Sequence, residues 1–438
     1  MTILTIEQLL NSPLNSVKHA KITNAQLTSF PEELFRHKDS IEIIDLSYNN
    51  LTELPNRITE FKNLKILFLS FNQFKVFPIQ LSNCEQLSMI AFKSNQLKGI
   101  EENSFPLSLR WLILTDNQID KIPESIGNCE LLQKFVFAGN RIKVLPESLS
   151  NCKNLELIRA SANQFIDFPS LLLTLPKLAW LAFEGNPFSK LPTKEAEHKL
   201  PFIDWDEITL LNQLGEGASG IIHKGIMNHS QSEIAIKTFK GDLTSDGYPK
   251  DELKISLLAG KHPHLVPLIA QSKNKEQNKD ALIMSYISSD YKNLGLPPSL
   301  ESCSRDVIII NEKWSTKQFI TLLIGIASAM QHLHQNHISH GDLYAHNIMY
   351  HPNHFHGYLG DFGAASFYEN SKFSSEIERI DVRAFGYLMD DLIDLIEIPS
   401  EHLIKIKLAC LNEKIFNRPT FREIVTMLNA LNKNQIAT

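Results

Sequence analysis

The sequence predicts two domains, an α/β solenoid of short repeats followed by a globular α+β domain. Two observations support this prediction. An asparagine recurs every 22 or 23 residues through the first part of the chain, and strand-like and helical segments alternate after it. The 438 residues are also many for one hydrophobic core. The predicted domains are residues 1–200 and 201–433, with a short tail at 434–438.

The repeats are defined by their asparagines, which are Asn49, Asn72, Asn95, Asn117, Asn140, Asn163 and Asn186. Each ends the pattern L-x-x-L-x-L-x-x-N or a close variant, and a proline follows in most copies. A degenerate first copy has Ala25 in the asparagine position, which brings the number of repeats to about eight.

This pattern resembles leucine-rich repeats. One such unit cannot bury its apolar strand face alone, whereas stacked units share a continuous core. We expect each asparagine side chain to bond backbone groups of its own and neighbouring coils, because no regular ladder satisfies them there. Proline is expected in the following turn because it fixes φ and ends strand pairing.

The concave face of the solenoid is the predicted partner surface. Side chains that flank the strand leucines should point into the curve, and they are Ile66, Phe68, Met89, Arg110, Trp111, Ile113, Lys134, Leu157, Arg159, Trp180 and Glu184. They either pack against one another along the strands or form an exposed aromatic band that binds a protein substrate or partner.

Three of the five cysteines, Cys84, Cys129 and Cys152, occupy the same repeat position. We expect buried structural thiols there rather than a metal site, because cysteine is frequently fully buried. The odd number of cysteines and the absence of a C-x-x-C pair favour a reducing compartment. A cytoplasmic location is therefore expected, with export into a host cell left open.

Composition excludes some function classes. The formal net charge of −6 is mild and spread along the chain, which gives no support for nucleic-acid binding. The sequence has no apolar run of about 18 residues, so no membrane span is expected.

Five polar motifs follow one another in the second half of the chain. They are L-G-E-G-A-S-G-I-I from Leu214, A-I-K ending at Lys237, a helical Glu252, H-G-D-L-Y-A-H-N from His340, and D-F-G from Asp361. The glycines lie between two strand-like segments, an arrangement in which backbone amides can close over phosphates. One glycine motif is weak on its own, but five parts in order are specific.

The set resembles protein kinases of the eukaryotic type, and with the repeats it is similar to bacterial leucine-rich-repeat kinase-like proteins. The resemblance implies a bilobal α+β domain that uses ATP and Mg²⁺. It implies Asp342 as the catalytic base, Lys237 as the cation over the α- and β-phosphates, and Asn347 and Asp361 as Mg²⁺ ligands. The implied catalytic set is therefore Asp342, Lys237 and Asn347.

The resemblance also implies a nucleotide-binding set, with Glu252 as the partner of Lys237 and Met284 as the gatekeeper before the adenine hinge. Its members are Leu214, Gly215, Gly217, Gly220, Ile222, Ala235, Lys237, Glu252, Met284, Ser285 and Ile287.

The chain departs from the kinase pattern in three places. Gly341 stands where H-R-D has arginine, so control by a phosphate on the activation loop is not expected. Tyr344 replaces the lysine that follows the catalytic Asp, and His346 is the nearest alternative cation. Asp361 and Asp381, which resembles the helix Asp that ties down the catalytic loop, are close in sequence, so the platform for a substrate peptide is short.

Three functions remain open. The first is an ATP- and Mg²⁺-dependent protein kinase, acting on Ser or Thr, whose repeats recognise a protein. The alternatives are an inactive kinase fold that serves as a binding scaffold and a small-molecule phosphotransferase. Residues 290–312 form an insertion that either touches substrate or wraps the lower lobe.

Overall fold

The structure is a computed structural model that describes residues 5–192, 200–241, 243–369 and 371–436. The chain forms two compact units, Met1–Pro176 and Lys177–Thr438, so the last repeat of the sequence belongs to the second unit. The boundary predicted at residue 200 stays a prediction, because it adjoins residues 193–199, which lie outside the described part of the chain.

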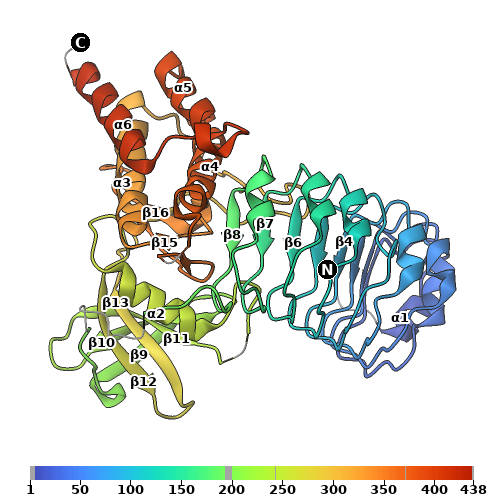
Figure 1. Cartoon of the computed structure of the whole chain (residues 1–438). Coiled ribbons are helices and arrows are strands. Elements are labelled where there is room, and N and C mark those ends of the chain that lie inside the picture. Colours follow the sequence, from blue (N-terminus) through green and yellow to red (C-terminus); the bar gives the residue numbers. More distant parts are fainter. Residues whose placement is uncertain (1–4, 193–199, 242, 370, 437–438) are drawn as a thin grey trace. The chain divides into compact units, whose positions relative to one another are not determined.

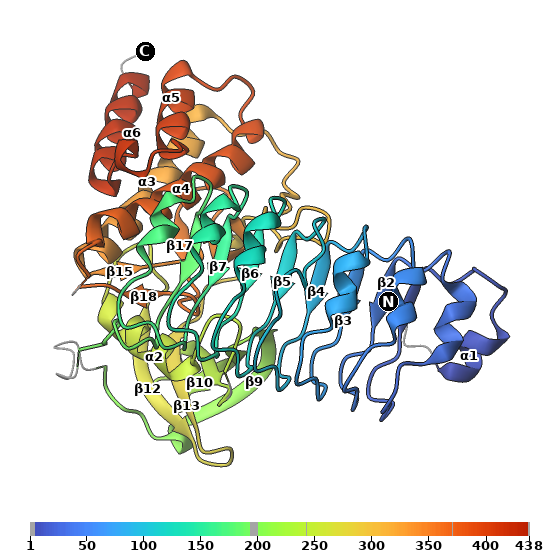
Figure 2. The same ribbon diagram turned by 45° about the vertical axis from the view of Figure 1, so that its right-hand side comes forward.

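The first unit is a solenoid of short parallel strands (Figures 1 and 2). The strands pair in chain order and in constant register, with Ile43 opposite Ile66 and Ile66 opposite Met89. They are β1 (His19–Lys21), β2 (Ile43–Asp45), β3 (Ile66–Phe68), β4 (Met89–Ala91), β5 (Trp111–Ile113), β6 (Lys134–Val136) and β7 (Leu157–Arg159).

The opposite side of most coils is a short 3₁₀ turn instead of a long helix, and the coil between β4 and β5, which is described in full, has none. These turns are η1 (Glu32–His37), η2 (Asn56–Glu60), η3 (Ile79–Asn83), η4 (Glu124–Asn128), η5 (Glu147–Asn151) and η6 (Ser170–Thr174). Each follows directly after a proline, such as Pro55 with φ −69° or Pro146 with φ −67°. The predicted role of proline in these turns is confirmed. One α-helix, α1 (Ile6–Asn11), precedes the coils.

The repeat asparagines bond backbone groups as expected. Asn72 Nδ2 donates to the carbonyl of Leu69 in its own coil and to that of Leu46 in the preceding coil, at 3.1 and 3.0 Å. Its Oδ1 accepts from the N–H of Leu51 at 2.9 Å. Asn72 is itself buried, so these bonds replace the water that the turn would otherwise need.

The solenoid core is apolar, and the three repeat cysteines lie within it. Cys84, Cys129 and Cys152 are buried free thiols, and Cys152 Sγ donates to the Ile126 carbonyl at 3.3 Å. Burial raises the pKa of Cys129 and of Cys152 to about 12. The interpretation of these cysteines as buried structural thiols is confirmed. Within the described ranges, no cluster of three or more histidine, cysteine, aspartate or glutamate side chains is arranged to hold a metal ion.

The second unit contains an N-terminal lobe, at the bottom of Figure 1, which is built on an antiparallel sheet in the order β12-β13-β11-β10-β9. Helix α2 (Pro249–Ala259) starts with a proline in its first turn and ends before Gly260, which has φ +68°. The strands are β9 (Ile208–Glu216), β10 (Gly220–Met227), β11 (Glu233–Phe239), β12 (Leu268–Asn274) and β13 (Lys279–Ser285).

The C-terminal lobe, at the top of Figure 1, is helical and also contains short strands. Helix α3 (Thr316–Gln335) is capped by Ser315 and Gln318 and packs on α6 (Phe421–Ile436). The other helices are α4 (Ser374–Leu392) and α5 (Glu401–Cys410), with short turns η8 (Ala345–Asn347), η9 (Ile393–Leu395) and η10 (Ile415–Asn417). The strands of this lobe are β14 (Lys292–Asn293), β15 (Ile338–Ser339), β16 (Ile348–Tyr350), β17 (Gly357–Leu359) and β18 (Ser366–Phe367). Two further elements precede both lobes in the chain: β8 (Trp180–Ala182), the strand of the last repeat, and η7 (Trp205–Glu207), which contacts β12 of the sheet lobe.

The predicted fold class is confirmed. An α/β repeat solenoid is followed by a bilobal α+β domain, with an antiparallel sheet in one lobe and helices in the other. Within the described ranges, no helix is both long and apolar enough to cross a membrane.

Candidate nucleotide and phosphoryl-transfer site

The glycine motif forms a hairpin between β9 and β10. Gly217 N–H donates to the Gly220 carbonyl at 2.9 Å and closes the turn. A Cβ at Gly220 would lie 2.7 Å from the Thr238 carbonyl oxygen and 3.2 Å from the Lys237 side chain. Glycine is therefore required where the loop approaches Lys237, whereas Gly215 and Gly217 border open space.

Strand β11, helix α2 and the segment that follows β17 (Gly357–Leu359) bring three charged groups together. Lys237 Nζ on β11 forms an ion pair with Glu252 Oε1 on α2, and it lies 3.9 Å from Asp361 Oδ1. The Glu252 side chain is only 4% exposed. Burial alone would lower the pKa of Lys237, but the charges of Asp361 and Glu252 raise it, so the ammonium persists. The predicted Lys237–Glu252 partnership is present in the structure.

Asp361 has an unusual backbone and an ionised side chain. Its φ is +53°, and its Oδ1 accepts from the Gly363 N–H at 3.0 Å. Enclosure acts to raise the pKa of Asp361, but the charge of Lys237 and the Gly363 N–H lower it below the ordinary value. An ionised carboxylate can bind a divalent cation, and the lysine beside it can bind the phosphate that the cation also contacts.

The catalytic loop is held by a buried carboxylate on α4. Asp381 is fully buried and accepts from the backbone N–H groups of His340 and Gly341, at 2.9 and 3.1 Å. Its Oδ2 also lies 3.0 Å from His334 Nε2. Asp381 therefore ties down the loop in the way the sequence predicts.

Within this loop Asp342 and Asn347 are hydrogen-bonded partners. Asn347 Nδ2 donates to Asp342 Oδ2 and to the Asp342 carbonyl, both at 2.9 Å. The amide nitrogen is committed in this way, so the Asn347 oxygen is the atom left to bind a cation.

A cavity of about 490 Å³ joins these groups between the two lobes. Its volume lies in the range usual for small-molecule sites. Of the predicted residues, it is lined by Leu214, Gly215, Ile222, Ala235, Lys237, Glu252, Met284, Ser285, Ile287, Asn347 and Asp361. Gly217 and Gly220 lie in the adjoining hairpin, and Asp342 reaches the site through its bond to Asn347.

The segment after β13 forms the side of the cavity where a base is expected. Ser285 N–H donates to the Pro267 carbonyl at 2.9 Å, so it is already engaged. Ser285 would therefore contact a base through its carbonyl and not its N–H, beside Tyr286 and Ile287, which also line the cavity.

The insertion supplies two residues that sequence reasoning did not assign. Arg305 forms ion pairs with Asp390 and Asp391 of α4, which fastens the segment to the C-terminal, helical lobe. Asp306 Oδ1 accepts from His346 Nδ1, and its Oδ2 accepts from the His346 N–H, both at 2.8 Å. No spacing rule links residues forty positions apart, so this contact could not be read from the sequence.

His346 lines the cavity, and its surroundings favour the protonated imidazole. Burial acts to lower its pKa, but the hydrogen bond and charge of Asp306, with the charges of Asp342 and Asp361, raise it. The sequence had indicated His346 as the alternative to the missing lysine, and the structure places it at the cavity wall.

Seven of the side chains expected to point into the concave curve are buried, and two of them, Trp180 and Glu184, belong to the second unit. Trp180 and Glu184 are 1% and 5% exposed. Trp180 Nε1 donates to the Leu343 carbonyl at 3.1 Å, and its ring stacks on Tyr344 with centroids 4.2 Å apart. Of the two alternatives expected for the concave face, the exposed band does not hold for these two residues, because β8 packs on the catalytic loop.

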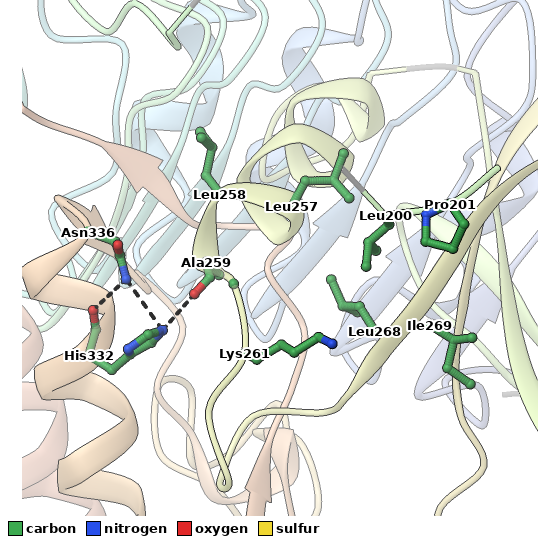
Figure 3. A pocket seen from close by; sticks show the side chains of 11 residues that line it. Leu200, Pro201, Leu257, Leu258, Ala259, Lys261, Leu268, Ile269, His332 and Asn336 are labelled. Atoms are coloured by element: carbon green, nitrogen blue, oxygen red, sulfur yellow. Dashed lines mark hydrogen bonds between the residues drawn. The ribbon is translucent and has the colours of Figure 1, made fainter. Parts of the chain in front are cut away.

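The second unit also has a cavity of about 530 Å³ near the end of α2 (Figure 3). Leucine, proline and isoleucine side chains line it, and His332 Nε2 bonds the Ala259 carbonyl at 2.7 Å at one end. Among the described residues that line it, Lys261 is the one with a permanently charged side chain, and none carries a carboxylate.

Comparison with known families supports this geometry. Residues 208–384 match the protein kinase domain family, and residues 16–74 and 108–129 match leucine-rich repeat families. A solved leucine-rich repeat protein of Leptospira interrogans is 24% identical over 41% of this chain and 51% of that chain, with a TM-score of 0.34, too low to establish a shared overall fold.

Among curated relatives, cyclin-dependent kinase 11.1 of Caenorhabditis elegans is 28% identical over 33% of this chain and 19% of its own length. The serine/threonine-protein kinase PITSLRE of Drosophila melanogaster is 25% identical over 52% and 26%. The L-type lectin-domain containing receptor kinase V.5 of Arabidopsis thaliana is 28% identical over 41% and 26%. The match thus spans about a quarter or less of these relatives. The chain combines leucine-rich repeats with a protein kinase domain.

Proposed function

We propose that this protein is an ATP- and Mg²⁺-dependent protein kinase that acts on serine or threonine. One observation carries the proposal: Lys237, Glu252, Asn347 and Asp361, distant in sequence, line one cavity whose remaining walls are largely apolar. Leu214, Ile222 and Ala235 offer flat contacts for a base, and the charged groups lie together for a triphosphate.

The chain's own residues account for the steps of transfer. Lys237 binds phosphate oxygens, and Glu252 orients its ammonium. The oxygens of Asn347 and Asp361 would hold Mg²⁺, which when bound neutralises charge that develops on the phosphoryl group. Asp342 orients the attacking hydroxyl and accepts its proton, and Asn347 fixes that carboxylate at 2.9 Å.

His346 replaces part of the charge that the chain lacks at Tyr344. Tyr344 is buried and stacked against Trp180, so it cannot reach a phosphate. His346 lines the cavity, its ring is oriented by Asp306, and it is able to donate a hydrogen bond to a phosphate.

The repeats are proposed to recognise a protein partner through their concave face. Phe68, Trp111 and Ile113 are partly buried there and pack against Ile43, Ile66 and Met89. These apolar groups, with charged neighbours such as Lys134 over the Trp111 ring at 4.3 Å, suit a protein surface. The five free thiols fit the expected cytoplasmic location.

A second candidate, a small-molecule phosphotransferase, is favoured by one observation. Helix α4 begins at Ser374, so few residues after Gly363 can form a platform for a peptide. An inactive scaffold is less well supported, because the Lys237–Glu252 pair and the Asp342–Asn347 pair are both formed.

Incubation with γ-labelled ATP and Mg²⁺ separates these functions. We expect label on protein serine or threonine, with a loss of at least 100-fold in Lys237→Met and in Asp342→Asn. Thermal shift by ATP should persist in Asp342→Asn, which keeps the Lys237 contact. Label only on a small molecule would select the second candidate, and undiminished label in both variants would refute the assignment.

A further inference from the structure

We propose that the last repeat coil, residues 180–189, anchors the segment after D-F-G in its catalytic arrangement and does so in place of a phosphate. The proposal rests on the proposed function for its effect on rate, but not for the contacts themselves. Both the coil and the segment belong to the second unit.

Three hydrogen bonds join the coil to β18. Phe183 N–H donates to Ser366 Oγ at 2.9 Å, and Phe367 N–H donates to Glu184 Oε2 at 2.8 Å. Ser189 Oγ donates to the Phe367 carbonyl at 2.9 Å. On its other edge β18 pairs with β15, with Ser339 opposite Ser366. The segment is therefore held from both sides.

Glu184 is built into this contact. Its Oε2 accepts from Phe367 N–H and shares the single Ser189 hydroxyl hydrogen with the Phe367 carbonyl, and its Oε1 accepts from the Gly185 N–H at 3.1 Å. The carboxyl group is buried, so each bond is made in a poorly hydrated environment, where loss of the acceptor leaves the Phe367 N–H without its partner.

The missing arginine of the catalytic loop is explained by the same coil. Gly341 has φ +68°, and a Cβ there would lie 2.6 Å from the Leu181 carbonyl oxygen of β8 and 2.6 Å from that of Ala364. The coil and the segment thus fill the space next to the loop. A side chain that reached for a phosphate has no room to leave the backbone at this position.

Trp180 fixes the other end of the contact. It bonds the Leu343 carbonyl and stacks on Tyr344 and on Tyr387 of α4, with ring centroids 4.2 and 5.3 Å apart. The residue after the catalytic Asp342 and the strand β18 are therefore both fastened to one rigid turn of chain. Positioning of this kind affects turnover more than nucleotide affinity.

The test compares Glu184→Ala and Glu184→Gln with Ser161→Ala in the full-length protein. Gln keeps an oxygen that can accept from Phe367. Ser161 occupies the same repeat slot one coil earlier, and its hydroxyl has no hydrogen-bond partner among the described residues. Two quantities are measured: hydrogen exchange of the 364–369 backbone amides, and kcat and KM for ATP.

In Glu184→Ala we expect exchange at Phe367 at least 10-fold faster and kcat at least 10-fold lower, with KM for ATP within 2-fold. Glu184→Gln should restore both, and Ser161→Ala should change neither. Phosphatase treatment of the wild type should leave kcat unaltered. Ser189→Ala, which removes the hydroxyl contacts to Phe367 and Glu184 and leaves the Glu184 carboxyl group in place, is the second variant if Glu184→Ala fails to fold.

Unchanged exchange in Glu184→Ala, or a kcat that phosphatase abolishes, would overturn the proposal. A Gln variant as defective as Ala would also overturn the acceptor role. If the wild type transfers no phosphoryl group, the proposed function fails, and the exchange comparison alone then decides whether the coil anchors the segment.

Discussion

Trp111 and Trp180 occupy the same position of the repeat, six residues before Asn117 and Asn186, yet they have different roles. Trp111 is partly buried beside Ile66 and Met89, with the Lys134 ammonium over its ring. Trp180 is fully buried between Tyr344 and Tyr387 of the kinase domain. A repeat position thus fixes where a side chain starts, while the neighbouring element decides what it does.

The largest expected effect is a difference in unfolding free energy between alanine variants of these two tryptophans. Trp180→Ala removes a buried ring and a hydrogen bond, so the second unit should lose about 3–5 kcal/mol of unfolding free energy. Trp111→Ala removes a partly buried ring and should cost the first unit about 1–2 kcal/mol. Denaturant unfolding of both variants checks this order. Equal losses would show that Trp180 is not packed on the catalytic loop.

Gly341→Ala tests the close approach of the coil to the loop. Its Cβ would meet two backbone oxygens at 2.6 Å, and alanine disfavours φ +68°, so we expect a loss of about 2–4 kcal/mol. Gly217→Ala borders open space and should change the unfolding free energy by less than about 1 kcal/mol. The pair is compared by thermal unfolding. A stable Gly341→Ala protein would mean that Leu181 is not at the loop.

Glu184 predicts a pH dependence of stability. Burial, with a smaller contribution from the Asp251 charge, raises the pKa of Glu184 from 4.5 to about 7, although its hydrogen bonds oppose the shift. Between these pH values the folded state binds more protons than the unfolded state. Stability therefore falls as pH rises through this window, by roughly 3 kcal/mol, and stays lower above it.

Glu184→Gln does not titrate, so its unfolding free energy should lack this fall. The measurement is the difference between variant and wild type from pH 4.5 to 8. A constant difference across that range would contradict the burial of the carboxyl group.

Much of the fold could be predicted from the sequence because its signals are local or periodic. The asparagine spacing sets the coils, and proline φ sets the turns that follow. The kinase resemblance implies the Lys237–Glu252 pair. Asp342 and Asn347 lie five residues apart in one motif, which already places them in the same loop. The contacts of Trp180, Glu184 and Asp306 could not be predicted, because each depends on a tertiary partner with no fixed spacing. The departure from H-R-D at Gly341 is explained by the Leu181 and Ala364 carbonyls, which leave no room for a side chain.

The most direct test of the central claim is a crystal structure of the protein with Mg²⁺ and a non-hydrolysable ATP analogue. The account predicts the triphosphate between Lys237 and Asp361, with the metal on the oxygens of Asn347 and Asp361. It would be contradicted by a nucleotide bound outside the cavity that those residues line, or by a metal held by neither of them.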